Sequence, residues 1–406
     1  MNLANLTAGI ESLTKQAQEF AIGATAGAPH MDLNSLISSQ PRGLYNFISD
    51  IRNAKSKEDE RSRVDKELAN IRQKFANSSS LSSRDKKKYV WKMCYMYMLG
   101  YDIDFGHLEF ISLLSSTKFQ EKSVGYMAFS LMLRPGDELM TLVVNSMRND
   151  LIGQLIWGQT LALAAVSNIG GNDLAEALAG DVQRLILGTM ETKAYNNVAV
   201  SAEEEIRNKS LICKKACLCL LRFYRTNPDC LVLEDWMKRL GKLLEDRDLG
   251  VVTSVMSLML GLVSSNPPYF EPLVPYVISI LNRLVISRSC SADYLYYRTP
   301  SPWLQVKCLR LLQYYKMPND NELLNEILGN ILIRTEVSES LNKSNADHSI
   351  LFEAINLVIF YGADAASYLK VTYCWLHVWV CFHCFCSGFP EPVVLARRNP
   401  QANQFK

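Results

Sequence analysis

The feature that most constrains the fold is a helical pattern in which apolar residues return at three- and four-residue intervals. Val64, Leu68, Ile71 and Phe75 follow this spacing, so they fall on one face of a single helix. Similar faces recur in pairs with a period of roughly 35 to 55 residues, and several end at a proline. The inner segments of these pairs are 125–131, 159–165, 214–224, 251–262, 305–315 and 351–361, and the segments between them include 139–147, 236–244 and 273–284.

This pattern predicts an all-α protein. Paired helices at this period are typical of an α-solenoid of HEAT or armadillo repeats, in which each pair buries its apolar face against its neighbours. An irregular all-α globule is the alternative that the pattern leaves open. No segment alternates apolar and polar residues for long enough to predict a sheet.

The composition divides the chain into three parts. Residues 1–41 are rich in small and polar residues and are expected to form a poorly ordered extension, without the features of a signal peptide. Residues 42–362 carry the helical pattern, interrupted by an expected loop at 192–209. Residues 363–406 form a Cys- and aromatic-rich, then polar, tail that is expected to be disordered. No apolar run reaches the roughly 20 residues that span a bilayer.

The residue types needed for catalysis or metal binding are sparse. The five histidines are scattered, and no phosphate-binding Gly-rich loop, His-Glu-x-x-His pair or nucleophile elbow occurs. Cys94, Cys213, Cys217, Cys219 and Cys308 stand among apolar residues, which favours buried thiols in a reducing cytosol. We therefore predict no enzyme, no catalytic residue, no cofactor and no metal. Zinc binding by Cys and His of the segment 374–386 is the weaker alternative.

Positive charge is concentrated near the start of the helical region. The whole chain has a formal net charge of +2, whereas residues 42–92 contain 14 Lys/Arg and 7 Asp/Glu. Four of these lysines lie within 86–92, at the start of an expected helix whose dipole disfavours them, and Lys74 lies one helix earlier. This cluster predicts a pocket for phosphate groups.

The anion bound there is expected to belong to a membrane. Tyr89 and Trp91 could stack on bases, but no basic stripe continues along the rest of the chain, so nucleic acid is not predicted as a partner. About 1 kcal/mol per basic residue gives only roughly millimolar binding to an anionic surface. The cluster is therefore expected to act together with other contacts.

Seven dispersed segments resemble one known family. They are 42–53, 66–72, 86–90, 99–107, 249–253, 302–307 and 351–355, and they are similar to the N-terminal trunk of the alpha-adaptins, large subunits of the plasma-membrane clathrin adaptor complex. The resemblance covers about residues 42–362. The chain departs from the family pattern at three places. Arg84 stands where a tyrosine is expected, Trp91 replaces a small residue, and the segment 194–210 resembles an insertion.

The resemblance implies a non-enzymatic α-solenoid trunk that recruits cargo and clathrin to the cytoplasmic face of the plasma membrane in endocytosis. It also implies contact of Arg52 with dileucine cargo beside the small sigma subunit and assembly with beta and mu subunits, with the beta subunit docked through more distal repeats. Because the match ends near Gly362, sigma binding is expected to survive better than beta binding. A generic α-solenoid scaffold for nuclear transport or RNA remains the alternative. The implied contacts for phosphatidylinositol 4,5-bisphosphate are Arg42, Gly43, Lys74, Lys86, Lys87, Lys88, Tyr89, Val90, Trp91 and Lys92.

Overall fold

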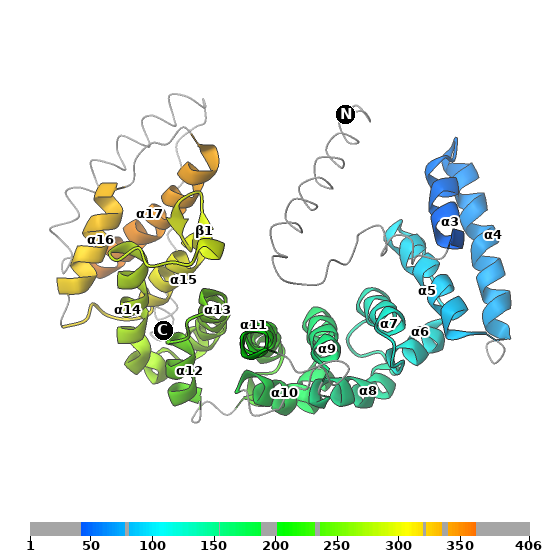
Figure 1. Cartoon of the computed structure of the whole chain (residues 1–406), viewed down its shortest axis with the longest axis horizontal. Helices are drawn as coiled ribbons and strands as arrows, with labels where there is room; N and C mark the ends of the chain where they lie inside the picture. Colours follow the sequence, from blue (N-terminus) through cyan, green and yellow to red (C-terminus); the bar gives the residue numbers. More distant parts are fainter. Residues whose placement is uncertain are drawn as a thin grey trace, which may run out of the picture. The chain divides into compact units, whose positions relative to one another are not determined.

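The computed structural model describes residues 42–77, 81–153, 155–187, 201–231, 236–319, 322–334 and 340–362. This part of the chain holds 15 α-helices, α3 to α17, and one short hairpin (Figure 1). The predictions for the extension 1–41 and for the tail 363–406, including its cysteines and histidines, lie outside the described residues. The contacts divide the chain into two compact units, one ending at Met132 and the other beginning at Leu133.

The first unit is a small array of antiparallel helices. α5 packs against α3 on one side and α7 on the other, while α4 and α6 lie in a second layer against α5. The apolar face predicted from the sequence supplies the contacts of α4, where Val64, Ile71 and Phe75 are buried and Leu68 is half-buried. The helices of this unit are α3 (Arg42–Arg52), α4 (Lys57–Ala76), α5 (Ser83–Met98), α6 (His107–Leu114) and α7 (Phe119–Met132).

The second unit repeats this arrangement. Each of α9, α11, α13, α15 and α17 packs against the next in one row, and each is covered by the helix that precedes it, α8, α10, α12, α14 or α16 (Figure 1). The helices are α8 (Met140–Ile152), α9 (Ile156–Ile169), α10 (Asn172–Ile186), α11 (Ala202–Thr226), α12 (Trp236–Leu244), α13 (Leu249–Ser265), α14 (Val274–Val285), α15 (Pro302–Leu312), α16 (Glu322–Arg334) and α17 (Leu341–Tyr361).

The helix ends follow local sequence signals. Ser56, Ser82 and Ser201 precede α4, α5 and α11, and each side chain accepts a hydrogen bond from a backbone N–H of the first turn. Asn227 and Asn266 end α11 and α13, and the proline after each starts a 3-10 turn, at Pro228–Cys230 and Pro267–Leu273. The predicted breakers therefore end these two helices.

The predicted fold class is confirmed, because paired helices bury their apolar faces against preceding and following pairs. A helix inside such a row packs against neighbours on more than one of its faces. On α13, for example, Leu258 and Leu262 share one face and Val252 and Met256 share another, and all four are buried. Full burial of one such side chain stabilises the fold by about 1.5–3 kcal/mol.

Two local expectations were wrong. The expected loop at 192–209 is wrong over 202–209, which form the first turns of α11, while 192–200 lie outside the described residues. The triplet Glu203–Glu205 lies in the first turn of α11, where the helix dipole favours acidic residues. A hairpin also occurs where no sheet was expected: β1 (Leu295–Tyr296) pairs antiparallel with β2 (Thr299–Pro300) after the 3-10 turn Ala292–Tyr294. Its strands are too short to leave a period-2 signal.

None of the described helices combines the length and apolar character that crossing a membrane requires.

Candidate functional site

The basic cluster predicted from the sequence lies mainly on α5. Ser82 caps this helix by accepting from the Asp85 N–H at 3.2 Å, and its hydroxyl donates to the Asp85 carboxylate at 2.8 Å. Hydrogen bonds from Ser82 and from Lys88 lower the pKa of Asp85, so a carboxylate offsets the unfavourable position of lysines in the first turns. Inward-facing Val90, Met93 and Cys94 hold the helix in place.

Two of the clustered lysines are buried and paired inside the first unit. Lys92 and Lys87 are each 8% exposed. Lys92 forms an ion pair with Glu67 of α4 at 2.8 Å, and its ammonium lies 5.1 Å from the ring centre of Phe47 of α3. Lys87 donates to Gln120 of α7 at 3.1 Å, and burial lowers its pKa. These two lysines join α5 to three other helices.

The other basic groups are more accessible. Lys74 and Arg84 are exposed, and Lys86 and Lys88 are partly exposed. Lys88 pairs with Asp85 at 3.2 Å; although burial acts against its charge, this contact raises the pKa of Lys88. Arg84, Lys86 and Lys88 keep a positive surface on the first turns of α5, while Lys74 lies in the last turn of α4.

Helix α3 contributes its first turn to this surface. A Cβ on Gly43 would lie 3.6 Å from the Lys88 side chain, so the backbone at Gly43 is directly beside Lys88. The helix begins at Arg42, and the first four N–H groups of a helix have no partner within it. The structure thus brings Gly43 and Lys88, 45 positions apart in the sequence, next to each other.

Tyr89 and Val90 contribute packing rather than an open surface. Val90 is fully buried, and Tyr89 is 8% exposed with its ring edge-on to Phe75 of α4, centroids 6.1 Å apart. The Lys88 ammonium lies 4.4 Å from the centre of the Tyr89 ring. Tyr89 is therefore not available to stack on nucleic-acid bases, whereas Trp91 is partly exposed.

Arg52, predicted to contact cargo, lies apart from the lysines. It ends α3, where the helix dipole favours a cation, and it is exposed. Ten residues separate it from Arg42, which corresponds to about 15 Å along the helix. Arg52 therefore belongs to a separate surface at the C-terminal end of α3.

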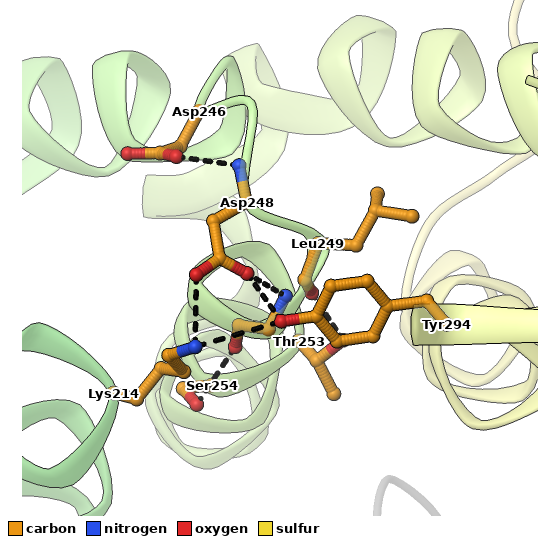
Figure 2. A network of polar contacts seen from close by, with 8 residues as sticks. Lys214, Asp246, Asp248, Leu249, Thr253, Ser254 and Tyr294 are labelled. Carbon is orange, nitrogen blue, oxygen red and sulfur yellow. Dashed lines mark hydrogen bonds and ion pairs between the residues drawn. The ribbon is translucent and has the colours of Figure 1, made fainter. Parts of the chain in front are cut away.

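A polar centre that sequence reasoning missed lies in the second unit (Figure 2). Asp248, the N-cap of α13, accepts from the Gly250 N–H at 2.8 Å, pairs with Lys214 of α11 at 2.8 Å and accepts from the Tyr294 hydroxyl. Burial acts to raise the pKa of Asp248, but hydrogen bonds from Lys214 and Tyr294 outweigh it and lower that pKa. A side chain on Gly250 would collide with the Tyr294 hydroxyl.

This centre gives a structural reason for Gly250, which belongs to the segment 249–253 on which the family resemblance rests. Asp248 connects α11, α13 and the turn before β1, so it fixes neighbouring repeats and the hairpin. The available sequence signal was an Asp two residues before a Gly at a helix start, which is the pattern of an Asx-type cap.

The predicted buried thiols are confirmed for the five cysteines named from the sequence. Burial raises the pKa of Cys94 and of Cys219 to about 12, which leaves both as inert thiols. Among the residues that the structure describes, no three His, Cys, Asp or Glu side chains gather closely enough to hold a metal ion.

Paired helices in two rows define the chain as a helical-repeat protein of the HEAT or armadillo class. Residues 60–374 match the family described as Adaptin N terminal region. The chain belongs to the adaptin family, and its resemblance to the N-terminal trunk of the alpha subunits is confirmed by its relatives.

Three curated relatives show the extent of this similarity. AP-2 complex subunit alpha-1 of Arabidopsis thaliana is 46% identical over 326 residues, covering 80% of this chain and 30% of that protein. AP-2 complex subunit alpha-2 of Dictyostelium discoideum is 39% identical, covering 81% and 32%. AP-2 complex subunit alpha of Schizosaccharomyces pombe is 38% identical, covering 82% and 36%. The chain spans about a third of the length of these relatives.

Proposed function

We propose that this chain forms the membrane-contacting N-terminal trunk of a non-enzymatic clathrin-adaptor large subunit. In this role it recruits cargo and coat to the cytoplasmic face of the plasma membrane during endocytosis. Similarity to AP-2 alpha subunits over 80% of the chain supports the class. The observation that supports the membrane role is the closeness of the first turn of α3 to Lys88, where a Cβ on Gly43 would lie 3.6 Å from the lysine side chain.

The ligand we propose is phosphatidylinositol 4,5-bisphosphate. Its phosphates match accessible ammonium groups beside the backbone N–H groups at the start of α3, which have no partner within that helix. Lys74, Lys86 and Lys88 make the headgroup contacts, with Arg42 and Gly43 at the start of α3 and Trp91 at the edge. Four further residues of the predicted site support it indirectly, because their burial and contacts hold α5 in position. These residues are Lys87, Tyr89, Val90 and Lys92.

The other partners belong to separate surfaces. We propose that Arg52, at the opposite end of α3, receives the acidic residue of dileucine cargo beside a small sigma subunit. Contacts with beta and mu subunits are proposed to involve further repeats. Because a few lysines alone give roughly millimolar attraction, the complex supplies the remaining affinity by avidity.

Co-sedimentation with lipid vesicles tests the headgroup site. The full chain is mixed with phosphatidylcholine vesicles with and without phosphatidylinositol 4,5-bisphosphate, and Lys86→Glu and Lys88→Glu are compared with the parent. Each charge reversal is expected to weaken binding to the phosphoinositide vesicles by about tenfold or more.

Lys238→Glu on α12 is the matched control, because it makes the same charge change at an exposed lysine of the second unit. Equal binding of the parent to both kinds of vesicle contradicts the headgroup site. Loss of binding in the Lys238 variant as well indicates attraction by net charge alone.

A further inference from the structure

A cationic pocket lies in the second unit. It has a volume of about 300 Å³ and is lined by residues from the end of α14, the hairpin β1–β2, and helices α15, α16 and α17. Its floor is apolar, with Leu284, Ile331 and Ile350 all buried. This volume lies at the lower end of the range for small-ligand sites.

The lining of the pocket has more cationic than anionic side chains. Arg288, Arg298 and Lys343 line it from three different elements, and Asp347 is the carboxylate among the lining residues. Asp347 already accepts from the Thr299 hydroxyl at 2.6 Å and lies 3.8 Å from the Lys343 ammonium. Neither arginine has an ion pair or side-chain hydrogen bond within the described residues. The formal charge of the lining is therefore +2, with two free guanidinium groups.

The backbone under both arginines is unusual. Tyr297 and Arg298 form the two-residue loop between the paired residues Tyr296 and Thr299, and their φ angles are 47° and 70°. Loops of this kind, with φ positive at both positions, strongly favour Asn-Gly. Arg288, just beyond α14, also has a left-handed φ of 48°. A residue other than glycine is destabilised by about 1 kcal/mol or more in this left-handed region of φ.

Two arginines thus occupy positions where glycine is better suited to the backbone. Non-glycine residues held at positive φ cluster at functional sites, so such a backbone angle points to a role of the side chain. Both of these residues are exposed and belong to the same pocket, so a shared ligand explains both.

We propose that this pocket binds a phosphate-bearing group. A phosphate monoester carries a charge of about −1.5 to −2 near neutral pH, which matches the lining, whereas a single carboxylate would leave one cation unpaired. The planar forks of Arg288 and Arg298 suit phosphate oxygens, and Lys343 adds a third donor. The source is either a soluble phosphate compound or a lipid headgroup. The proposal does not rest on lipid binding at α5.

Glycine variants give the sharpest test. Pyrophosphate is titrated into the full chain by calorimetry, and Arg288→Gly and Arg298→Gly are compared with the parent. Loss of one charge-assisted contact is expected to raise the Kd of pyrophosphate by about tenfold or more. The melting temperature is expected to stay equal or rise, because glycine adopts a left-handed φ without strain. Weaker binding in a variant that is not destabilised separates ligand contact from folding.

A matched control completes the experiment. Arg247→Gln removes a charge from an exposed arginine outside the pocket, and this variant is expected to bind pyrophosphate like the parent. Equal pyrophosphate binding by the parent and both glycine variants overturns the proposal, as does the absence of binding by the parent.

Vesicles containing phosphatidylinositol 4,5-bisphosphate separate the two sources. If Arg298→Gly weakens binding of both pyrophosphate and vesicles, the pocket takes a headgroup. If it weakens pyrophosphate binding alone, the pocket takes a soluble phosphate compound. A Lys86 variant that binds these vesicles normally contradicts the α5 site and leaves the pocket unaffected.

Discussion

At the residue scale, lysines that look alike in the sequence have different surroundings. Lys86 is partly exposed, while Lys87 and Lys92 are buried and connect α5 to neighbouring helices. Removing one partner of a buried ion pair leaves the other charge uncompensated, which costs much more than removing a solvated charge. The cluster therefore contains both supporting lysines and candidate ligand contacts.

Lys92→Met tests this distinction. It leaves the half-buried Glu67 without its ammonium partner, and we expect the free energy of unfolding to fall by about 2–4 kcal/mol. Lys86→Met is expected to change it by less than about 0.5 kcal/mol. Urea unfolding followed by circular dichroism measures both. Similar losses in the two variants would show that the Lys92–Glu67 pair does not stabilise the first unit.

Asp248 permits a prediction with a defined pH dependence. Its pKa is lowered in the folded protein, so the carboxylate stabilises the fold above the unfolded pKa near 4. That stabilisation is lost as pH falls below 4 through the folded pKa. Asp248→Asn is expected to lower the free energy of unfolding by about 2 kcal/mol at pH 7, with a smaller difference at about pH 3. A difference that stays constant with pH contradicts a role for the charge.

At the element scale, the spacing between helices depends on glycines whose environments differ. Gly125 of α7 lies against the backbone of α6: a Cβ there would be 2.8 Å from the Leu114 nitrogen and 3.0 Å from the Phe110 carbonyl oxygen. Backbone atoms of a packed helix cannot move aside as a flexible side chain does. Gly180 of α10, in contrast, is exposed and has nothing within 4 Å of its Cβ position.

These two glycines form a matched pair. Gly125→Ala is expected to lower the free energy of unfolding by about 2–3 kcal/mol by forcing α6 and α7 apart. Gly180→Ala is expected to raise it by about 0.5–1 kcal/mol, since alanine is the better helix former. Thermal and urea unfolding give both values. A stabilising effect of Gly125→Ala would contradict the close approach of the two helices.

Prediction of elements from the sequence succeeded where the apolar period is sustained. The segment 236–244 was predicted as a helix, and α12 spans those residues. The first turns of α11 were missed because they carry charge instead of an apolar stripe. The Ser201 and Glu204 spacing, in which Ser201 accepts from the Glu204 N–H at 3.3 Å, was the signal for that helix start.

At the scale of the whole molecule, charge is distributed unevenly. Residues 42–92 carry about +7 within a chain of net charge +2, so the remainder is net acidic. A local positive field of this kind attracts polyanions without making the entire molecule adhere to them. Its reach is set by the Debye length, about 10 Å at 0.1 M salt and about 3 Å at 1 M.

Vesicle binding by the full chain is therefore expected to weaken steeply with ionic strength. Between about 0.05 and 0.5 M NaCl we expect the apparent Kd for phosphoinositide vesicles to rise by at least about tenfold. The double variant Lys86→Glu, Lys88→Glu is expected to show a shallower dependence, measured by co-sedimentation across the same salt series. Binding that does not respond to salt contradicts an electrostatic surface and indicates apolar insertion.

The sequence by itself determined the all-α class, the repeat of paired helices, the family and the stretch in which positive charge gathers. Helical period, caps and breakers act between residues a few positions apart, so they can be read locally. Only the tertiary structure decided which lysines are buried, because Lys92 and Lys87 meet partners 25 and 33 positions away. It also placed Arg288, Arg298 and Lys343 around one pocket. Contacts between helices depend on packing, which no local pattern records.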